Sequence, residues 1–163
     1  MQSSTPYVAL GVHGFTPTLA SIPPERGVGK DNSKLKSPLV LCVDDDPGVR
    51  EFYGSLLVEE GYNVISAGTG AQALTLVQSR KDTVDAAILD YKLPGMNGFE
   101  LAVRLKQHDP LLPILMISSA FPDPEDMLPF VDTALTKGVP VGEILEGIQL
   151  LLASRRQRQN RKC

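Results

Sequence analysis

The stretch Asp85-Ala-Ala-Ile-Leu-Asp90-Tyr-Lys-Leu-Pro-Gly-Met-Asn-Gly98 decides the fold that this chain is expected to adopt. Four small or apolar residues, 86–89, lead directly into the Asp90 carboxylate, and a loop rich in glycine follows. A short apolar run bounded by turn residues is typical of a buried strand. Asp90 would then lie at the carboxyl end of that strand, where open α/β sheets bind their ligands. An acid at such a junction is more often a turn or cap residue, so other residues must decide its role.

A second apolar run, Leu39 to Val43, ends in the same way as the first. It leads into three consecutive acids, Asp44, Asp45 and Asp46, which are followed by proline. Aspartate before proline is a typical start of a helix, with the acid as N-cap and proline in the first turn. We therefore expect a strand followed directly by a helix that ends at Gly61.

The alternation of strand and helix continues through residues 38–153. Further strands are expected at 62–67, 113–117 and 131–136, and helices after Thr69, at 98–108, around 125–128 and from Val141 to about Arg156. Five such alternations predict an α/β domain whose parallel sheet is covered by helices on both faces, a doubly wound arrangement.

The two ends of the chain differ from this domain in composition. Residues 1–37 are rich in Ser, Thr, Pro and Gly without lasting periodicity, so we expect a disordered N-terminal extension. Residues 154–163 form a basic tail with five Lys or Arg and no acid. Such a tail could contact nucleic acid or an acidic surface, but it lacks aromatic residues and is more typical of a solvated helix end.

The overall composition favours a soluble globular protein and argues against membrane-spanning, secreted and disulfide-rich classes. The chain has 163 residues, of which 42% are hydrophobic and 21% charged, as in soluble globular proteins. No stretch approaches the ~18 apolar residues of a membrane span, and no secretory signal is visible. Two cysteines and two histidines indicate neither a disulfide framework nor a zinc site. A cytoplasmic location is the default expectation.

Five polar residues fall at carboxyl ends of predicted strands: Asp44, Asp45, Asp90, Ser118 and Lys137. In a parallel sheet these ends share one edge, so three carboxylates, a hydroxyl and an amine would meet there. Carboxylates so close repel one another, and Mg²⁺ relieves such repulsion because it prefers carboxylate and phosphate oxygens. An Asp90 oxygen could then attack phosphorus, with Lys137 pairing with phosphoryl oxygens and Ser118 donating a hydrogen bond to one.

These residues stand in four stretches that resemble the receiver domain of two-component response regulators. The stretches are Val43 to Pro47, Leu89 to Gly98, Pro113 to Ser118 and Leu135 to Lys137, and the resemblance covers about residues 38–153. It implies a flavodoxin-like (βα)5 fold with a five-stranded parallel sheet in the order 2-1-3-4-5.

The resemblance also implies residue roles. Asp90 would be the phosphoacceptor for a sensor histidine kinase or a histidine phosphotransfer protein, Ser118 the switch hydroxyl and Lys137 the invariant lysine. Asp45 would bind Mg²⁺ directly and Asp44 through water, with Asp90 and the backbone carbonyl of Lys92 completing the metal site. The chain would catalyse its own phosphorylation and dephosphorylation without being a metabolic enzyme.

Three features depart from the usual pattern of that family. Gly138 follows Lys137 where proline is usual, and Ala134 stands where an aromatic switch residue is common. The segment 120–138 is short and rich in proline. These departures concern the region through which the family usually relays its signal.

Three functions follow from this interpretation. The first is a phosphorylatable switch that acts on a downstream protein or in a phosphorelay. The second is a receiver-like interaction module that never takes phosphate, and the third is a hydrolase, for which the chain shows no cap domain. Only about ten residues follow the last predicted helix, so we expect a stand-alone receiver or a fragment, without direct DNA or membrane binding; homodimerisation stays open.

Overall fold

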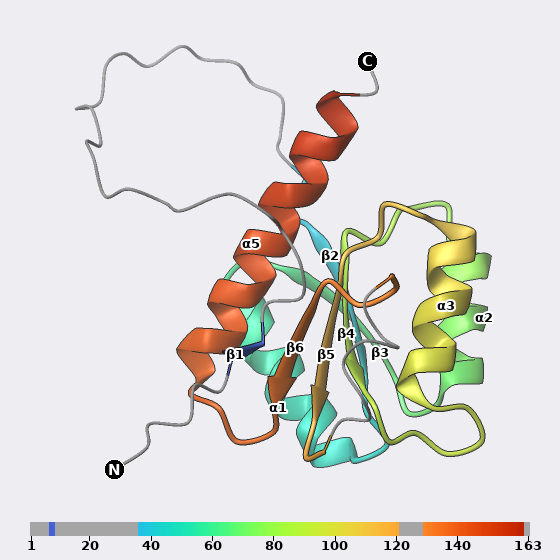
Figure 1. The fold of residues 1–163 in the computed structure, drawn as a ribbon, viewed down its shortest axis with the longest axis vertical. Coiled ribbons are helices and arrows are strands. Elements are labelled where there is room, and N and C mark those ends of the chain that lie inside the picture. Colours follow the sequence, from blue (N-terminus) through green and yellow to red (C-terminus); the bar gives the residue numbers. More distant parts are fainter. Residues whose placement is uncertain (1–6, 9–35, 121–128, 162–163) are drawn as a thin grey trace.

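The computed structural model describes residues 7–8, 36–120 and 129–161, which form one sheet with helices on both faces (Figure 1). The strand order is β1-β6-β5-β4-β2-β3. The strands are β1 (Tyr7–Val8), β2 (Leu39–Val43), β3 (Asn63–Ala67), β4 (Ala86–Asp90), β5 (Ile114–Ser118) and β6 (Thr133–Thr136). From β2 to β6 all neighbouring strands are parallel. These five strands confirm the predicted order 2-1-3-4-5.

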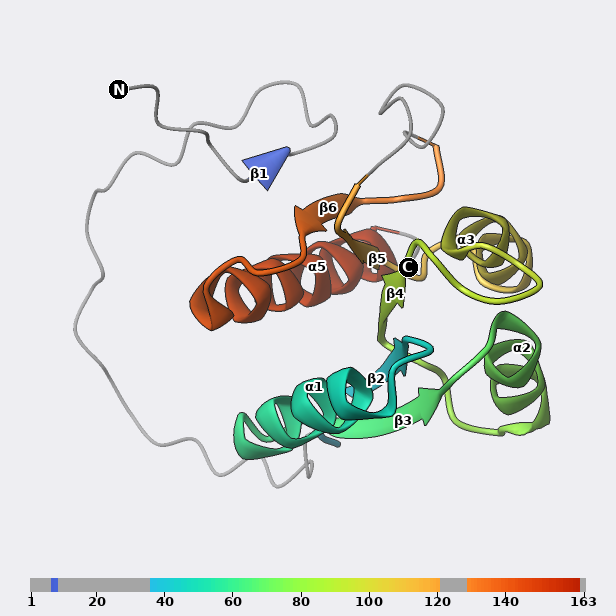
Figure 2. The same ribbon diagram turned by 90° about the horizontal axis from the view of Figure 1, so that it is seen from below.

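In the described part of the chain, four helices lie in two layers around this sheet. They are α1 (Pro47–Glu59), α2 (Gly70–Ser79), α3 (Gly98–His108) and α5 (Val141–Asn160). Figure 2 shows α1 and α5 on one face and α2 and α3 on the other. The short helix predicted around residues 125–128 lies outside the described residues.

The apolar runs form central strands because both of their faces are covered. Every residue of β2, β4 and β5 is buried. Successive side chains of a strand point to opposite faces. In β2, accordingly, Leu41 packs in the core on the side of α2 and α3, whereas Val40 and Cys42 pack in the core on the side of α1 and α5.

Each of the first three helices follows a strand's carboxyl end, after a short loop for α1 and α2 and after seven residues for α3, and a side chain caps it. Oδ1 of Asp46 accepts from the backbone N–H groups of Gly48 and Val49, at 2.7 and 3.2 Å. Thr69 and Asn97 cap α2 and α3 in the same way. The predicted cap at Asp46 is confirmed, and the short loop after β2 holds Asp44 and Asp45 beside the start of α1.

The ends of the domain differ in detail from the prediction. Strand β6 begins at Thr133, two residues later than expected. Just before it, the carboxylate of Asp132 accepts from the N–H of Ile114 at 2.9 Å, and the N–H of Asp132 donates to the Ile114 carbonyl at 2.9 Å. Helix α5 continues to Asn160, since Arg and Gln favour helix and neither Gly nor Pro interrupts them. Among the described helices, none is long and apolar enough to cross a membrane.

The sheet also carries a strand that the sequence did not clearly indicate. Strand β1 pairs antiparallel with β6, with Tyr7 opposite Leu135 and Val8 opposite Ala134. Most of the first 37 residues lie outside the described part, so their disorder stays a prediction.

Candidate functional site

The predicted site residues come together at the carboxyl edge of the sheet. Asp44 follows β2, Asp90 is the last residue of β4, Ser118 the last of β5, and Lys137 follows β6. One carboxylate oxygen from each of Asp44, Asp45 and Asp90 lies within 4.8 Å of the others. The parallel topology therefore gathers the acids from two strands that are separated by more than 40 residues in sequence.

Lys137 bridges two of these acids. Its Nζ donates to Oδ2 of Asp44 at 2.9 Å and to Oδ2 of Asp90 at 2.8 Å. Both carboxylates are almost fully buried. Burial alone lowers the pKa of Lys137, but hydrogen bonds and charge from Asp90 and Asp44 outweigh it and raise the pKa above its ordinary value. The ammonium is therefore charged at neutral pH and neutralises part of the acid cluster.

The other oxygen of each buried acid is held by the backbone. Oδ1 of Asp44 accepts from the N–H of Asp46 at 3.0 Å, and Oδ1 of Asp90 accepts from the N–H of Lys92 at 3.2 Å. The Lys92 residue thus lies at the site through its amide, whereas the role of its carbonyl as a metal ligand stays a prediction. These bonds fix the orientation of both carboxylates.

Ser118 is buried next to Lys137 but faces its own loop. Its Oγ donates to the carbonyl of Ala120 at 2.8 Å and accepts from the N–H of the same residue at 3.3 Å. The backbone N–H of Lys137 donates to the Ser118 carbonyl at 2.9 Å. The hydroxyl is therefore close to the lysine along the sheet edge, and in this conformation its bonds go to Ala120.

Arg50 supports the acid loop, a role that the sequence analysis missed. Its Nη1 donates to the carbonyls of Asp44 and Asp45, at 2.6 and 3.0 Å. Long helical side chains point back toward the helix N-terminus, so an arginine in the first turn after the Asp46 cap can reach this loop. Its position one turn after the acids was the signal available in the sequence.

Gly98 lets α3 approach the phosphoacceptor candidate closely. A Cβ atom at this position would overlap the carbonyl oxygen of Asp90 and would lie 2.9 Å from Cα of Tyr91. The N–H of Gly98 donates to the Tyr91 carbonyl at 2.8 Å. The Asn97-Gly98 pair therefore both caps the helix and closes the loop that begins at Asp90.

The donor set fits a small, hard divalent cation. Asp44, Asp45 and Asp90 offer carboxylate oxygens, and Asp45 is exposed. Mg²⁺ prefers this ligand type and usually keeps several waters, which the exposed side of the cluster can accommodate. Lys137 occupies one oxygen of each buried acid, so the cluster retains further oxygen lone pairs for a cation.

Comparison with known proteins places these residues in a family. The family model described as the response regulator receiver domain matches residues 40–148. The transcriptional regulatory protein TcrA of Mycobacterium tuberculosis is 32% identical over 94 residues, which cover 58% of this chain and 36% of TcrA. Sporulation initiation phosphotransferase F of Bacillus subtilis is 35% identical over 80 residues, or 49% of this chain and 63% of that protein. The matched part is thus less than two thirds of each relative.

Solved receiver domains share the fold. A CheY-like receiver domain protein of Methanospirillum hungatei has a TM-score of 0.69 and 25% identity, covering 75% of this chain and 98% of that one. The response regulator TrrA of Thermotoga maritima, solved in complex with Mg(2+)-BeF, has a TM-score of 0.64 and 29% identity, covering 70% of this chain and 98% of TrrA. Because the family match runs from β2 into α5 and solved receivers share the topology, the chain belongs to the response regulator receiver domain family of two-component systems.

Proposed function

We propose that this receiver is a phosphorylatable switch, with Asp90 accepting a phosphoryl group from a histidine kinase or a histidine phosphotransfer protein. The observation that carries the proposal is the cluster of three carboxylates in which Lys137 bridges Asp44 and Asp90. A buried acid pair held by one lysine offers both a nucleophile and a cation for the transferred group.

The proposed transfer follows from the positions of these groups. An Asp90 oxygen attacks the phosphorus of phosphohistidine, the P–N bond breaks, and the histidine nitrogen leaves with its electron pair. The product is an acyl phosphate on Asp90 and a free histidine on the donor. Catalysis of such a transfer depends mainly on positioning and on stabilising the charge of the phosphoryl oxygens. Lys137, already 2.8 Å from Asp90, pairs with one of them.

Mg²⁺, held by Asp44, Asp45, Asp90 and the Lys92 carbonyl, would neutralise further charge on the transferred group. Donor chemistry supports this assignment, because three carboxylates in reach of one another suit a hard cation. The relative TrrA, solved with Mg(2+)-BeF, supports it by analogy.

Ser118 would then report the phosphoryl group. Its hydroxyl leaves the Ala120 carbonyl and donates to a phosphoryl oxygen, which shifts the loop after β5. We propose that this shift alters a surface for a downstream protein partner or passes the phosphoryl group along a relay. The proposed setting is cytoplasmic, and homodimerisation is one way in which the switch would act.

A labelling experiment tests the proposal. The full chain is incubated with Mg²⁺ and a small acyl phosphate, and the protein is assayed for an acid-stable, base-labile phosphoryl group. Asp90→Asn should abolish labelling. Asp46→Asn is the matched control, because asparagine caps a helix as well as aspartate does and Asp46 lies outside the three-acid cluster.

The other outcomes separate the alternatives. Absence of label with any donor or kinase would refute phosphorylation and leave the phosphate-independent interaction module. Equal labelling of the parent and Asp90→Asn would show that another residue accepts the phosphoryl group. Rapid turnover of many phosphomonoesters would favour the hydrolase.

A further inference from the structure

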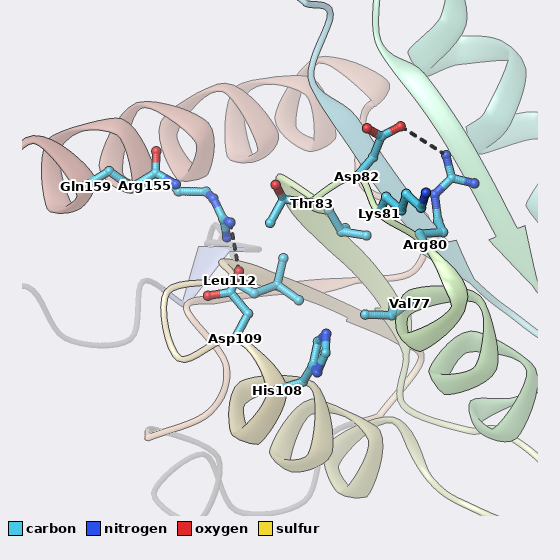
Figure 3. Close-up of a pocket in the computed structure, with 11 residues that line it drawn as sticks. Val77, Arg80, Lys81, Asp82, Thr83, His108, Asp109, Leu112, Arg155 and Gln159 are labelled. Carbon is cyan, nitrogen blue, oxygen red and sulfur yellow. Dashed lines mark hydrogen bonds and ion pairs between the residues drawn. The ribbon is translucent and has the colours of Figure 1, made fainter.

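A charged pocket lies at the edge of the sheet opposite to Asp90. It is enclosed by the end of α2, the loop that joins α2 to β4, the end of α3 and the last turns of α5 (Figure 3). Its volume is about 420 Å³. The loops here precede β4 and β5, whereas Asp90 and Ser118 are at the other ends of those strands. The pocket therefore shares no residue with the proposed phosphorylation site.

Arg155 is the unusual residue of this pocket. Its side chain is 4% exposed, and its Nη2 donates to Oδ2 of Asp109 at 2.7 Å. Its Nε and Nη1 are buried and have no hydrogen-bond partner among the described residues. Figure 3 shows the side chain reaching from α5 toward Asp109 and Leu112. Buried donors on a charged group that lack a partner are costly, so these nitrogens point to a missing acceptor.

The surroundings of Arg155 are positively charged. Of the side chains that line the pocket, Arg80, Lys81 and Arg155 are cationic, and Asp82 and Asp109 are anionic. Lys36 adds a cation through its 2.7 Å ion pair with Asp82. These six side chains carry two more positive than negative charges, whereas the whole chain has a net charge of −3. The pocket thus favours an anion at one end of an acidic protein.

The pocket also has an apolar wall. Val77 and Leu112 line it together with the charged groups. Its volume falls in the lower part of the range of small-molecule pockets, about 300–1,000 Å³. There is thus room for an organic ligand as well as its charged group.

We propose that this pocket binds a small organic dianion, whose carboxylate or phosphate group accepts a hydrogen bond from Nε or Nη1 of Arg155, the two nitrogens that have no partner among the described residues. A guanidinium N–H group donates to a carboxylate or a phosphate oxygen alike, so the two chemistries share one mode of recognition. Thr83 and Gln159 also line the pocket, and both are exposed. The carbon part lies on Val77 and Leu112. Lys81, together with Arg80, which also pairs with Asp82 at 3.9 Å, offers positive charge to the second anionic group.

A purely structural role for Arg155 makes a different prediction. In that case the Arg155–Asp109 pair only fastens α5 to the loop after α3, and no anion binds. The binding proposal does not rest on phosphorylation of Asp90, so either can fail alone.

Calorimetric titration of the full chain with four compounds tests the proposal. These are glycerol 3-phosphate, succinate, inorganic phosphate and, as the uncharged control, glycerol. We expect one anion to bind with 1:1 stoichiometry and to shift the backbone amide resonances of Thr83 and His108 rather than those of Asp90 and Ser118. Glycerol 3-phosphate and succinate distinguish a phosphate from a carboxylate ligand, and inorganic phosphate shows whether the carbon part contributes.

Three variants decide the role of the pocket. Arg155→Met should weaken binding by about tenfold or more, since it removes charged hydrogen bonds. Lys81 is exposed, so we expect Lys81→Gln to fold and to bind the anion several-fold more weakly than the parent. This variant tests the proposal if Arg155→Met does not fold. Arg156→Gln, on the same helix but outside the pocket, is the matched control and should bind as the parent does. Failure of all three anions to bind, or equal affinity in the parent and both pocket variants, would overturn the proposal.

Discussion

Lys137 neutralises part of the negative charge of two buried carboxylates. We expect its removal to reduce the conformational response to phosphorylation more than phosphorylation itself. In Lys137→Ala, Asp44 and Asp90 face each other without the ammonium that now lies 2.9 and 2.8 Å from them. Under the proposed function, Mg²⁺ and a phosphodonor would still load Asp90, but the cation proposed to pair with the phosphoryl group would be gone. We expect partial phosphorylation and a much smaller change in backbone amide shifts upon phosphorylation. Lys81→Ala, which removes an exposed lysine side chain at the opposite edge of the sheet, is the control. An equally large spectral response in Lys137→Ala and the parent would contradict this role.

The environment of Cys42 predicts how the free energy of unfolding depends on pH. Burial, reinforced by the charge of Asp44, raises the pKa of its thiol from 9.0 to about 12. The folded state therefore holds the proton more tightly than the unfolded state. Between about pH 9 and 12 the unfolded chain loses this proton first, so the free energy of unfolding should fall as pH rises through that range.

The thiol prediction is tested in a Cys163→Ser background, where Cys42 is the one remaining cysteine. A thiol reagent at pH 8 should label native protein very slowly and unfolded protein at once. Cys42→Ala should show a flatter decline of stability above pH 9. Fast labelling of the native protein would mean that Cys42 is accessible.

At the scale of elements, the contact between α3 and β4 depends on a missing side chain. Gly98→Ala places a methyl group against the backbone of Asp90 and Tyr91, which cannot move aside as a side chain could. We expect a loss of about 1–3 kcal/mol in the free energy of unfolding, as for overpacked sites. Gly54→Ala is the matched control, since a Cβ there meets nothing within 4 Å in the interior of α1.

The control should stabilise the protein by roughly 0.5–1 kcal/mol, because alanine favours helix more than glycine does. Chemical denaturation of the two variants and the parent measures both values. Equal stabilities of Gly98→Ala and the parent would show that α3 can withdraw from Asp90 at little cost.

The elements were predictable where local sequence determines them. The runs Leu39 to Val43 and Ala86 to Leu89 are apolar, and an acid follows each of them. The sequence therefore predicted both strands and the edge of the sheet at which the acids lie. Local pattern says nothing of contacts between distant side chains. Arg50 on the acid loop and Arg155 against Asp109 were therefore missed, although both are held by specific hydrogen bonds. The pairing of β1 with β6 was missed because two residues carry too little pattern.

For the whole molecule, the acid cluster predicts that Mg²⁺ stabilises the fold. A ligand that binds only the native state adds about 2.7 kcal/mol at a concentration one hundred times its Kd. We expect the melting temperature of the parent to rise with Mg²⁺ concentration and that of Asp45→Asn to rise much less. Glu59→Gln, at the far end of α1 and outside the cluster, should respond like the parent. An equal rise of the melting temperature in all three proteins would show that Mg²⁺ binds outside this acid cluster.

The length of α5 has a consequence for its free end. Its 20 residues span about 30 Å at ~1.5 Å per residue, whereas a five-residue strand spans only about 17 Å. The helix thus extends past the sheet, as Figure 1 shows. Beyond Leu152 it is tied to the domain by the buried Arg155–Asp109 pair and the more exposed Arg158–Asp132 pair. Salt screens exposed ion pairs more than buried ones. Rising ionic strength should therefore weaken the Arg158–Asp132 pair and fray the last turns of α5, whereas the helix up to Arg155 stays folded.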